Sequence, residues 1–174
     1  MQDDRNESFF DEIYEKVFPI VYRIVYKITG RSDVSEDLCQ EAFIKYHQRM
    51  NSIPDPEQAK FWLIRVSKNL ALNYQKRKGR ERKAYLKVLK EPSRPMDTGE
   101  DEALKKEASA AVKVALEKLP EKLRVVMILK EYSNLNYKEI ASTLGISEGN
   151  VKVRVYRARE YLSKLLDEGE TYVP

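Results

Sequence analysis

Cationic and aromatic side chains suited to holding nucleic acid gather in a short stretch near the C-terminal end of the chain. Successive residues of an α-helix lie about 100° apart, so residues 151–162 divide into an apolar face and a polar one. The apolar face consists of Val151, Val155, Ala158 and Leu162. Arg and Lys hold phosphates, and residues near the start of a groove-bound helix read base edges. The residues that we expect to face DNA are Lys152, Val153, Arg154, Tyr156 and Arg157.

The segment before this stretch carries the signals of a helix joined to the next one by a tight turn. Asn136, followed three residues later by Glu139, fits a capping box. Gly145 is suited to end that helix, and Ser147 to cap the following one. Two short helices with a glycine in the turn, the second one basic, are typical of a helix-turn-helix. The alternative is an amphipathic bundle helix with a solvated charged face, but the capped helix and turn favour DNA contact.

Residues for other kinds of chemistry are scarce. The chain has one cysteine, Cys39, and one histidine, His47. No glycine-rich phosphate loop, metal-ligand spacing or nucleophile–base pair is visible. We therefore expect no enzyme activity, cofactor, metal or small-molecule substrate. Cys39 falls on an inward helix face, where a buried and inert thiol is expected, although a redox-sensing role stays open.

Composition predicts a mostly helical protein whose charge is unevenly distributed. The 174 residues are 34% charged, with few glycines and prolines. The formal net charge is +4, yet the first fifty residues lean acidic and residues 76–83, KRKGRERK, are almost wholly basic. Such local basic density points to a polyanion. No secretory signal and no apolar run of about 20 residues is visible, so we expect a cytoplasmic protein without direct membrane insertion.

Helical periodicity predicts an all-α fold of two small helical domains joined by a flexible linker. The first helix ends at Gly30 and should be kinked or divided at Pro19. A second begins near Asp33, which with Glu36 fits a capping box. After a loop at 51–58, a third helix covers about 59–77. Prolines, a glycine and acids then indicate a linker. Further helices are expected at about 103–118, 121–132 and 137–144.

Two segments of the chain resemble parts of a known family. Residues 119–162 resemble region four of bacterial sigma factors, and residues 35–50 with 59–80 resemble region two. Their order, spacing and short length are similar to those of extracytoplasmic-function (ECF) sigma factors of the sigma-70 type. The resemblance implies a region-two domain at 1–90, a linker at 91–104 and a region-four domain at 105–174. It also implies an alternative sigma factor with three partners: core RNA polymerase, promoter DNA and an anti-sigma factor.

The resemblance places the main polymerase contact on the helix that begins near Val34. One face of this helix is expected to point inward, and the other carries acids and amides around an apolar residue. An exposed Ile44 among polar neighbours suits contact with a protein, although an ordinary acidic surface is the alternative without the resemblance. The residues that we expect to bind polymerase are Asp37, Gln40, Glu41 and Ile44.

The resemblance assigns the minus-ten element to the loop after this helix and to the helix that follows. In the family the loop accepts a flipped base, and extruding a base costs a few kcal/mol. Amides can read bases, while cations follow the backbone, and the contacts of the basic tract should weaken with salt. We expect Trp62 to pack in the core. The minus-ten candidates are Asn51, Ser52, Lys68, Asn69, Asn73, Lys76 and Arg77.

In the region-four segment, the resemblance assigns the minus-thirty-five element to the basic helix. The family usually has Thr and Ser where this chain has Asn150 and Val153. Val153 cannot hydrogen-bond to a base, but it can contact a thymine methyl group. We therefore expect a preference that differs from that of its relatives. A second hypothesis is a helix-turn-helix regulator that never joins polymerase, which leaves the first ninety residues unexplained.

Overall fold

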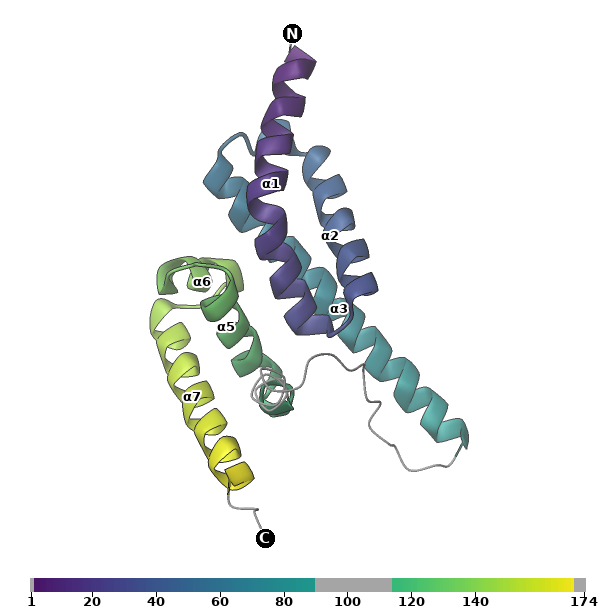
Figure 1. The fold of residues 1–174 in the computed structure, drawn as a ribbon, viewed down its shortest axis with the longest axis vertical. Coiled ribbons are helices and arrows are strands. Elements are labelled where there is room, and N and C mark those ends of the chain that lie inside the picture. The colour runs from purple at the N-terminus through teal and green to yellow at the C-terminus, as the bar shows by residue number, and fades with distance from the viewer. Residues whose placement is uncertain (1, 90–113, 171–174) are drawn as a thin grey trace.

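The computed structural model describes residues 2–89 and 114–170 (Figure 1). Within these two ranges every regular element is a helix, which confirms the expected all-α class. The expected linker at 91–104, and most of the helix expected at 103–118, lie outside the described residues. Residues 114–118 are helical.

The N-terminal half contains α1 (Gln2–Thr29), α2 (Ser32–His47), the short 3-10 helix η1 (Met50–Ser52) and α3 (Pro56–Leu89). Of the two expected effects of Pro19, a kink or a division of the helix, the division does not occur, because α1 continues through Pro19. Proline removes one backbone hydrogen bond, but the buried face of α1 packs on both α2 and α3. The helix ends before Gly30, which adopts the left-handed φ of 71° that glycine tolerates.

The start of α2 differs from the expected capping box. The helix begins at Ser32, and its cap residue, Arg31, makes no side-chain cap bond. Asp33 therefore lies inside the first turn, where its carboxylate accepts a hydrogen bond from Arg31 Nε at 3.1 Å. This bond lowers the pKa of the Asp33 carboxyl group below its usual value. The pairing with Arg31 takes the place of the predicted bond.

The third helix is longer than expected at both ends. It starts at Pro56, where the Asp55 carboxylate accepts a hydrogen bond from the Gln58 backbone N–H at 2.8 Å. It runs through the whole basic tract of residues 76–83. Lys and Arg are good helix formers, and Glu81 pairs with Lys78 at 3.1 Å across one turn. The tract is therefore a helical, exposed extension of α3.

The C-terminal half contains α5 (Glu121–Tyr132), α6 (Tyr137–Leu144) and α7 (Glu148–Glu170). The expected capping box is confirmed, because Asn136 Oδ1 accepts from the Glu139 backbone N–H at 2.9 Å and Glu139 Oε2 accepts from the Asn136 N–H at 2.7 Å. Gly145 ends α6 in the left-handed conformation, with φ of 66°. The helix-turn-helix therefore forms where local capping signals place it.

Buried aliphatic side chains fill the centre of each half. In the N-terminal half they come from α1, α2 and α3, whose helices pack against one another pairwise. In the C-terminal half α7 packs on α5 and α6. The two halves also touch: α5 lies against α1, and α6 lies against α3 (Figure 1).

Candidate nucleic-acid and protein interfaces

The first turn of α7 is held in place by its cap and by its apolar face. The Asn150 backbone N–H donates to Ser147 Oγ at 3.2 Å, as expected for an N-cap. Three of the four predicted apolar residues are buried against α5 and α6, and Leu162 is half-buried. The three buried ones are Val151, Val155 and Ala158. This packing fixes which side of α7 faces outward.

The outward face of α7 carries the residues expected to meet DNA. Tyr156 is 70% exposed and Val153 is 47% exposed, and Arg157 is exposed beside them. Val153 and Tyr156 lie in the N-terminal half of the second helix of the helix-turn-helix, the part that contacts base edges in such motifs.

The two remaining cations of this face already have partners within α7. Lys152 Nζ lies 2.8 Å from Glu148 Oε1, which raises the pKa of the lysine and lowers that of the glutamate. Arg154 Nε donates to Asn150 Oδ1 at 2.8 Å. These pairs orient both cations along the first two turns of the helix.

The four residues expected to bind polymerase share one exposed face of α2. Ile44 is 60% exposed, and Asp37, Gln40 and Glu41 are exposed around it. Glu41 Oε1 lies 2.9 Å from Lys45 Nζ. The opposite face holds Cys39, which is fully buried, and burial raises the pKa of its thiol to about 12. The predicted division of α2 into two faces is therefore present.

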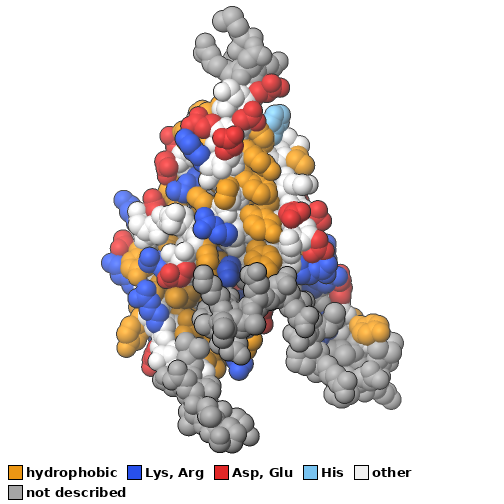
Figure 2. Space-filling model, in the orientation of Figure 1, with side chains coloured by type: hydrophobic (Ala, Val, Ile, Leu, Met, Phe, Trp, Pro, Cys, Tyr) orange, Lys and Arg blue, Asp and Glu red, His pale blue; other side chains and the backbone are white. Residues whose placement is uncertain are grey.

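An aromatic ladder beside this face was missed by the sequence analysis. Its rings lie one helical turn apart along α1, with neighbouring ring centroids 4.9–6.2 Å from each other. The ladder consists of Phe10, Tyr14, Phe18, Tyr22 and Tyr26. Figure 2 shows hydrophobic side chains in a band down the N-terminal half, with charged groups on either side. The signal was available in the sequence, since an aromatic residue recurs at every fourth position from 10 to 26.

The end of the ladder at Phe10 borders an apolar groove that is continuous with the exposed face of α2 expected to bind polymerase. Gln40 and Ile44 line it together with Phe10, Tyr14 and Phe43. The His47 ring stands edge-on to Phe10 with centroids 5.2 Å apart. The exposed Ile44 is thus the rim of a larger apolar surface.

The minus-ten candidates are spread over η1 and α3 and are not equally accessible. Asn51 and Ser52 are exposed in η1, and Asn69 and Asn73 are exposed on α3. Lys68 is only 7% exposed, so most of its side chain is covered in this arrangement. Burial, followed by the nearby Arg65 charge, lowers the pKa of Lys68.

The exposed end of α3 forms a shallow basic groove of about 540 Å³. It is lined by Asn73, Lys76, Gly79, Arg80 and Lys83. Arg77 lies beside it, with its guanidinium 5.7 Å from the Tyr74 ring centroid. Cations around a groove with little acid among them suit a phosphate backbone. Trp62, by contrast, packs against the core near the Tyr46 ring, as expected.

Two further observations concern only residues 2–89 and 114–170. No group of three or more His, Cys, Asp or Glu side chains there is arranged to hold a metal ion. No helix in those ranges combines the length and the apolar character that crossing a bilayer requires.

Comparison with known proteins matches both halves of the chain. The family description Sigma-70 region 2 matches residues 13–81, and Sigma-70, region 4 matches residues 109–162. The RNA polymerase sigma-H factor of Pseudomonas aeruginosa is 31% identical over 147 residues, which cover 76% of this chain and 72% of the relative. The ECF RNA polymerase sigma-E factor of Haemophilus influenzae is 33% identical over 141 residues, covering 76% and 74%.

Solved structures share the fold. The sigma factor RpoE, in complex with the anti-sigma factor NepR from Bartonella quintana, matches with a TM-score of 0.70 and 26% identity, covering 91% of this chain and 96% of that one. CnrH, in complex with the cytosolic domain of CnrY, matches with a TM-score of 0.68 and 22% identity, covering 91% and 88%.

Proposed function

Because this chain belongs to the ECF RNA polymerase sigma factors, we propose that it grips a promoter at two points while bound to core RNA polymerase. It is an alternative sigma factor that directs promoter recognition. The observation that carries the proposal is the presence of both regions in one chain, each with a surface suited to its partner. Sigma factors are non-catalytic, and we propose that the present chain is not an enzyme either. We also propose that it is cytoplasmic.

The polymerase contact is the outward face of α2. Its acids attract a basic partner, while Ile44 and the groove next to it offer apolar area at the centre. An apolar centre with a charged rim is the usual anatomy of a protein interface. We assign the contact to Asp37, Gln40, Glu41 and Ile44.

The minus-ten contact runs along η1 and the exposed part of α3. The basic groove on α3 follows the phosphate backbone of the DNA, with Lys76 in its lining and Arg77 beside it. Asn51 and Ser52 offer hydrogen bonds to an extruded base, and Asn69 and Asn73 offer amides along the strand. The Lys68 side chain can contact the DNA only after it becomes exposed. We assign residues 1–90 to the region-two domain and residues 91–104 to the linker.

The minus-thirty-five contact is the first three turns of α7, in a domain that we assign to residues 105–174. Val153 and Tyr156 supply apolar surface for a thymine methyl group, and Arg157 supplies a charge for a base edge or a phosphate. Lys152 and Arg154 support them at the backbone. An anti-sigma factor is the expected further partner, in keeping with the complex that RpoE, a relative of similar structure, forms with the anti-sigma factor NepR.

The decisive experiment separates the two grips by mutation. We expect Arg157→Ala to weaken binding of the upstream element roughly tenfold, the usual cost of a lost base or phosphate contact, without affecting core polymerase. Asp37→Ala with Glu41→Ala should do the reverse. Binding is measured by fluorescence anisotropy for the DNA and by co-elution for the polymerase.

Two control variants match these changes. Lys164→Ala removes a cation farther along α7, and Glu12→Ala removes an acid on the side of α1 opposite the ladder. Both should behave like the unmodified chain. If the chain does not bind core polymerase even at low salt, the sigma assignment fails and a regulator that acts alone becomes the better explanation.

A further inference from the structure

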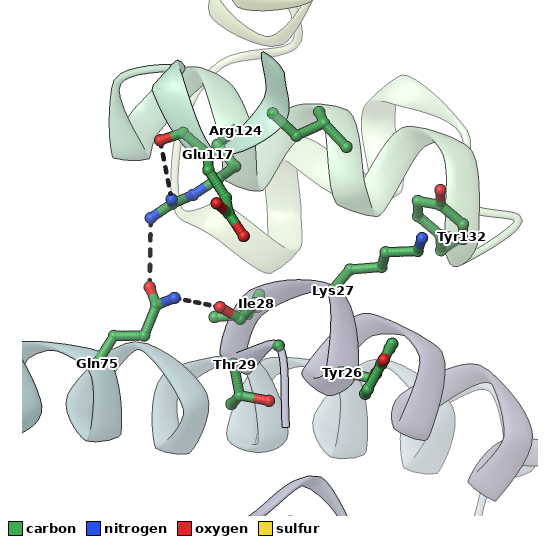
Figure 3. Close-up of a pocket in the computed structure, with 10 residues that line it drawn as sticks. Tyr26, Lys27, Ile28, Thr29, Gln75, Glu117, Arg124 and Tyr132 are labelled. Atoms are coloured by element: carbon green, nitrogen blue, oxygen red, sulfur yellow. Dashed lines mark hydrogen bonds between the residues drawn. The ribbon is translucent and has the colours of Figure 1, made fainter. Parts of the chain in front are cut away.

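A cavity of about 420 Å³ lies where the end of α1 meets α5. It is lined by residues of α1, α3, α5 and the helical residues 114–118 (Figure 3). None of the lining residues belongs to the sets assigned to polymerase or to DNA. Ligand sites have volumes of roughly 300–1,000 Å³ and are common where domains meet. The size and the place of this cavity therefore suit one small molecule.

Aromatic and aliphatic groups form part of the cavity lining. Tyr26 of α1 and Tyr132 of α5 contribute ring surface, and Leu116 contributes an aliphatic side chain. Groups of this kind give the body of a ligand its contact area, while a few polar groups fix its orientation. Aromatic rings also prefer other rings as neighbours. An occupant that matches this lining has an aromatic body.

Two cations reach the same cavity. The Lys27 ammonium lies 5.0 Å from the Tyr132 ring centroid. Arg124 donates from Nη1 to the Glu117 carbonyl at 3.5 Å. Within residues 2–89 and 114–170, neither Lys27 nor Arg124 forms an ion pair with a carboxylate. Lysine has three N–H donors and arginine five, so both cations keep donors for a bound anion.

Gln75 of α3 fixes the position of Arg124. Its amide nitrogen donates to the Ile28 carbonyl at the end of α1. Its amide oxygen accepts from Arg124 Nη2 at 3.2 Å. The guanidinium is thus held from two sides, by Gln75 and by the Glu117 carbonyl. A group that is ordered before a ligand arrives loses less entropy on binding.

One carboxylate lines the cavity as well. In Figure 3 the Glu117 carboxylate points toward the end of α1. In the part of the chain that the structure describes, this carboxylate neither accepts a hydrogen bond nor joins an ion pair. Thr29 and Gly30, at the carboxyl end of α1, also line the cavity. Because that end of a helix carries partial negative charge, a positive group of a ligand is favoured between it and Glu117.

We propose that this cavity binds a small zwitterion with an aromatic body, namely an aromatic α-amino acid. The carboxylate of the ligand pairs with Lys27 and Arg124. Its ammonium group pairs with Glu117, and its ring lies against Tyr26 and Tyr132. Exposed charges need no partner in water, but here charges of both signs converge on one cavity beside aromatic rings. The site does not rest on the proposed function, because it uses other residues.

Saturation-transfer difference NMR titrations of the free, full-length chain test the charge pattern with three probes. L-Phenylalanine carries both charges, 3-phenylpropionate lacks the ammonium group, and 2-phenylethylamine lacks the carboxylate. We expect phenylalanine to bind, and each of the other two to bind about tenfold more weakly, since each loses one charge-assisted contact. If phenylalanine, tyrosine and tryptophan all fail to bind, or if the three probes bind equally well, the proposal is overturned.

Two variants that each remove one charge test the orientation of the ligand. Glu117→Gln should weaken binding of phenylalanine about tenfold and should not weaken binding of 3-phenylpropionate. Lys27→Gln should weaken binding of both of these probes and should not weaken binding of 2-phenylethylamine. Glu131→Gln on α5 and Lys16→Gln on α1 make the same changes at exposed positions outside the lining. These two controls should bind all probes as the unmodified chain does.

The pattern of losses decides the inference. Circular dichroism first establishes that each variant keeps its helical content. The site is supported when each variant loses affinity only for the probes that carry the charge opposite to the one it removes. A folded Glu117→Gln that binds phenylalanine as well as Glu131→Gln does, or a folded variant that loses all three probes equally, overturns the inference. Binding to polymerase and DNA is measured separately, so failure of this site leaves the proposed function in place.

Discussion

Cys39 and Ile44 lie on the same helix in opposite environments, and the difference decides what each side chain can do. Ile44 is exposed at the rim of the groove, where its apolar area is available to a partner. Cys39 faces the core, and burial raises the pKa of its thiol because the thiolate would lose its hydration. A cysteine reacts as the thiolate, so the fold suppresses its chemistry.

We therefore expect Cys39 in the folded chain to react with Ellman's reagent at pH 8 far more slowly than in denatured chain. The pKa rises from 9.0 to about 12 on folding, so the native state binds this proton more tightly. The stabilisation that this pKa shift gives the native state is fully present below pH 9 and is lost as the pH rises toward 12. The free energy of unfolding, measured in urea across this pH range, tests whether stability falls as the pH rises.

Cys39→Ser is the control for both measurements. It should give no thiol signal and should remove this part of the pH dependence. Rapid labelling of the folded chain at pH 8 would show that the thiol is accessible. A promoter activity that responds to oxidant in the original chain but not in Cys39→Ser would restore a redox-sensing role.

At the residue scale, helical projection predicts environments that arise within one domain. The burial of Val151 and Val155 and the exposure of Ile44 follow from spacing of about 100° per residue. The burial of Lys68 does not. Lys68 lies one turn from Arg65, which contacts the Ser142 carbonyl of α6 from more than seventy residues away, and no local pattern around Lys68 indicates its burial.

The length of α3 is the main feature at the scale of elements. Its basic extension places the side chains that we propose to bind phosphate on a regular surface instead of a frayed end. Gly79 is the weak point of this extension, because glycine in a helix interior costs about 0.5–1 kcal/mol relative to alanine. A Cβ added at Gly79 meets no atom within 4 Å.

Two glycine substitutions should therefore change stability in opposite directions. Gly79→Ala should raise the free energy of unfolding by about 0.5–1 kcal/mol, because alanine reduces the conformational freedom of the unfolded chain and causes no clash in the folded helix. Gly145→Ala should lower it by about 1 kcal/mol, because φ of 66° strains any residue with a Cβ. Chemical denaturation followed by circular dichroism measures both. Changes of the same sign would contradict this account of the two helices.

The local end signals of α5 and α6 predict these helices well, whereas the capping box expected at Asp33 did not form and features governed by packing were not predicted. The bounds of α5 and α6 match the expected ranges, since proline, asparagine and glycine mark their ends. The continuity of α1 through Pro19 depends on its buried contacts with α2 and α3. The aromatic ladder has a clear spacing, yet its position next to Ile44 requires the pairing of two helices.

At the scale of the whole molecule, each half has its own helical packing, and polar contacts such as that of Arg65 with the Ser142 carbonyl join the two halves. The fold class and both family regions could be predicted from the sequence, because each half carries its own periodicity and motif. The docking could not, since Gln75 and Arg124 are ordinary surface residues until the tertiary contact brings them together.

This separation predicts how the N-terminal half behaves alone. A fragment of residues 1–90 should keep its helical circular dichroism and bind core polymerase, because α1, α2 and α3 supply its packing and the α2 face is intact. Lys68 should become reactive toward acetylation in the fragment, while it is protected in the full chain. Lys60, near the start of the same helix and paired with Glu57 of α3, is the reference amine in both. A folded fragment in which Lys68 stays as protected as in the full chain would show that α3 and its own neighbours bury the side chain, and the masking of this cation by the C-terminal half would then be wrong.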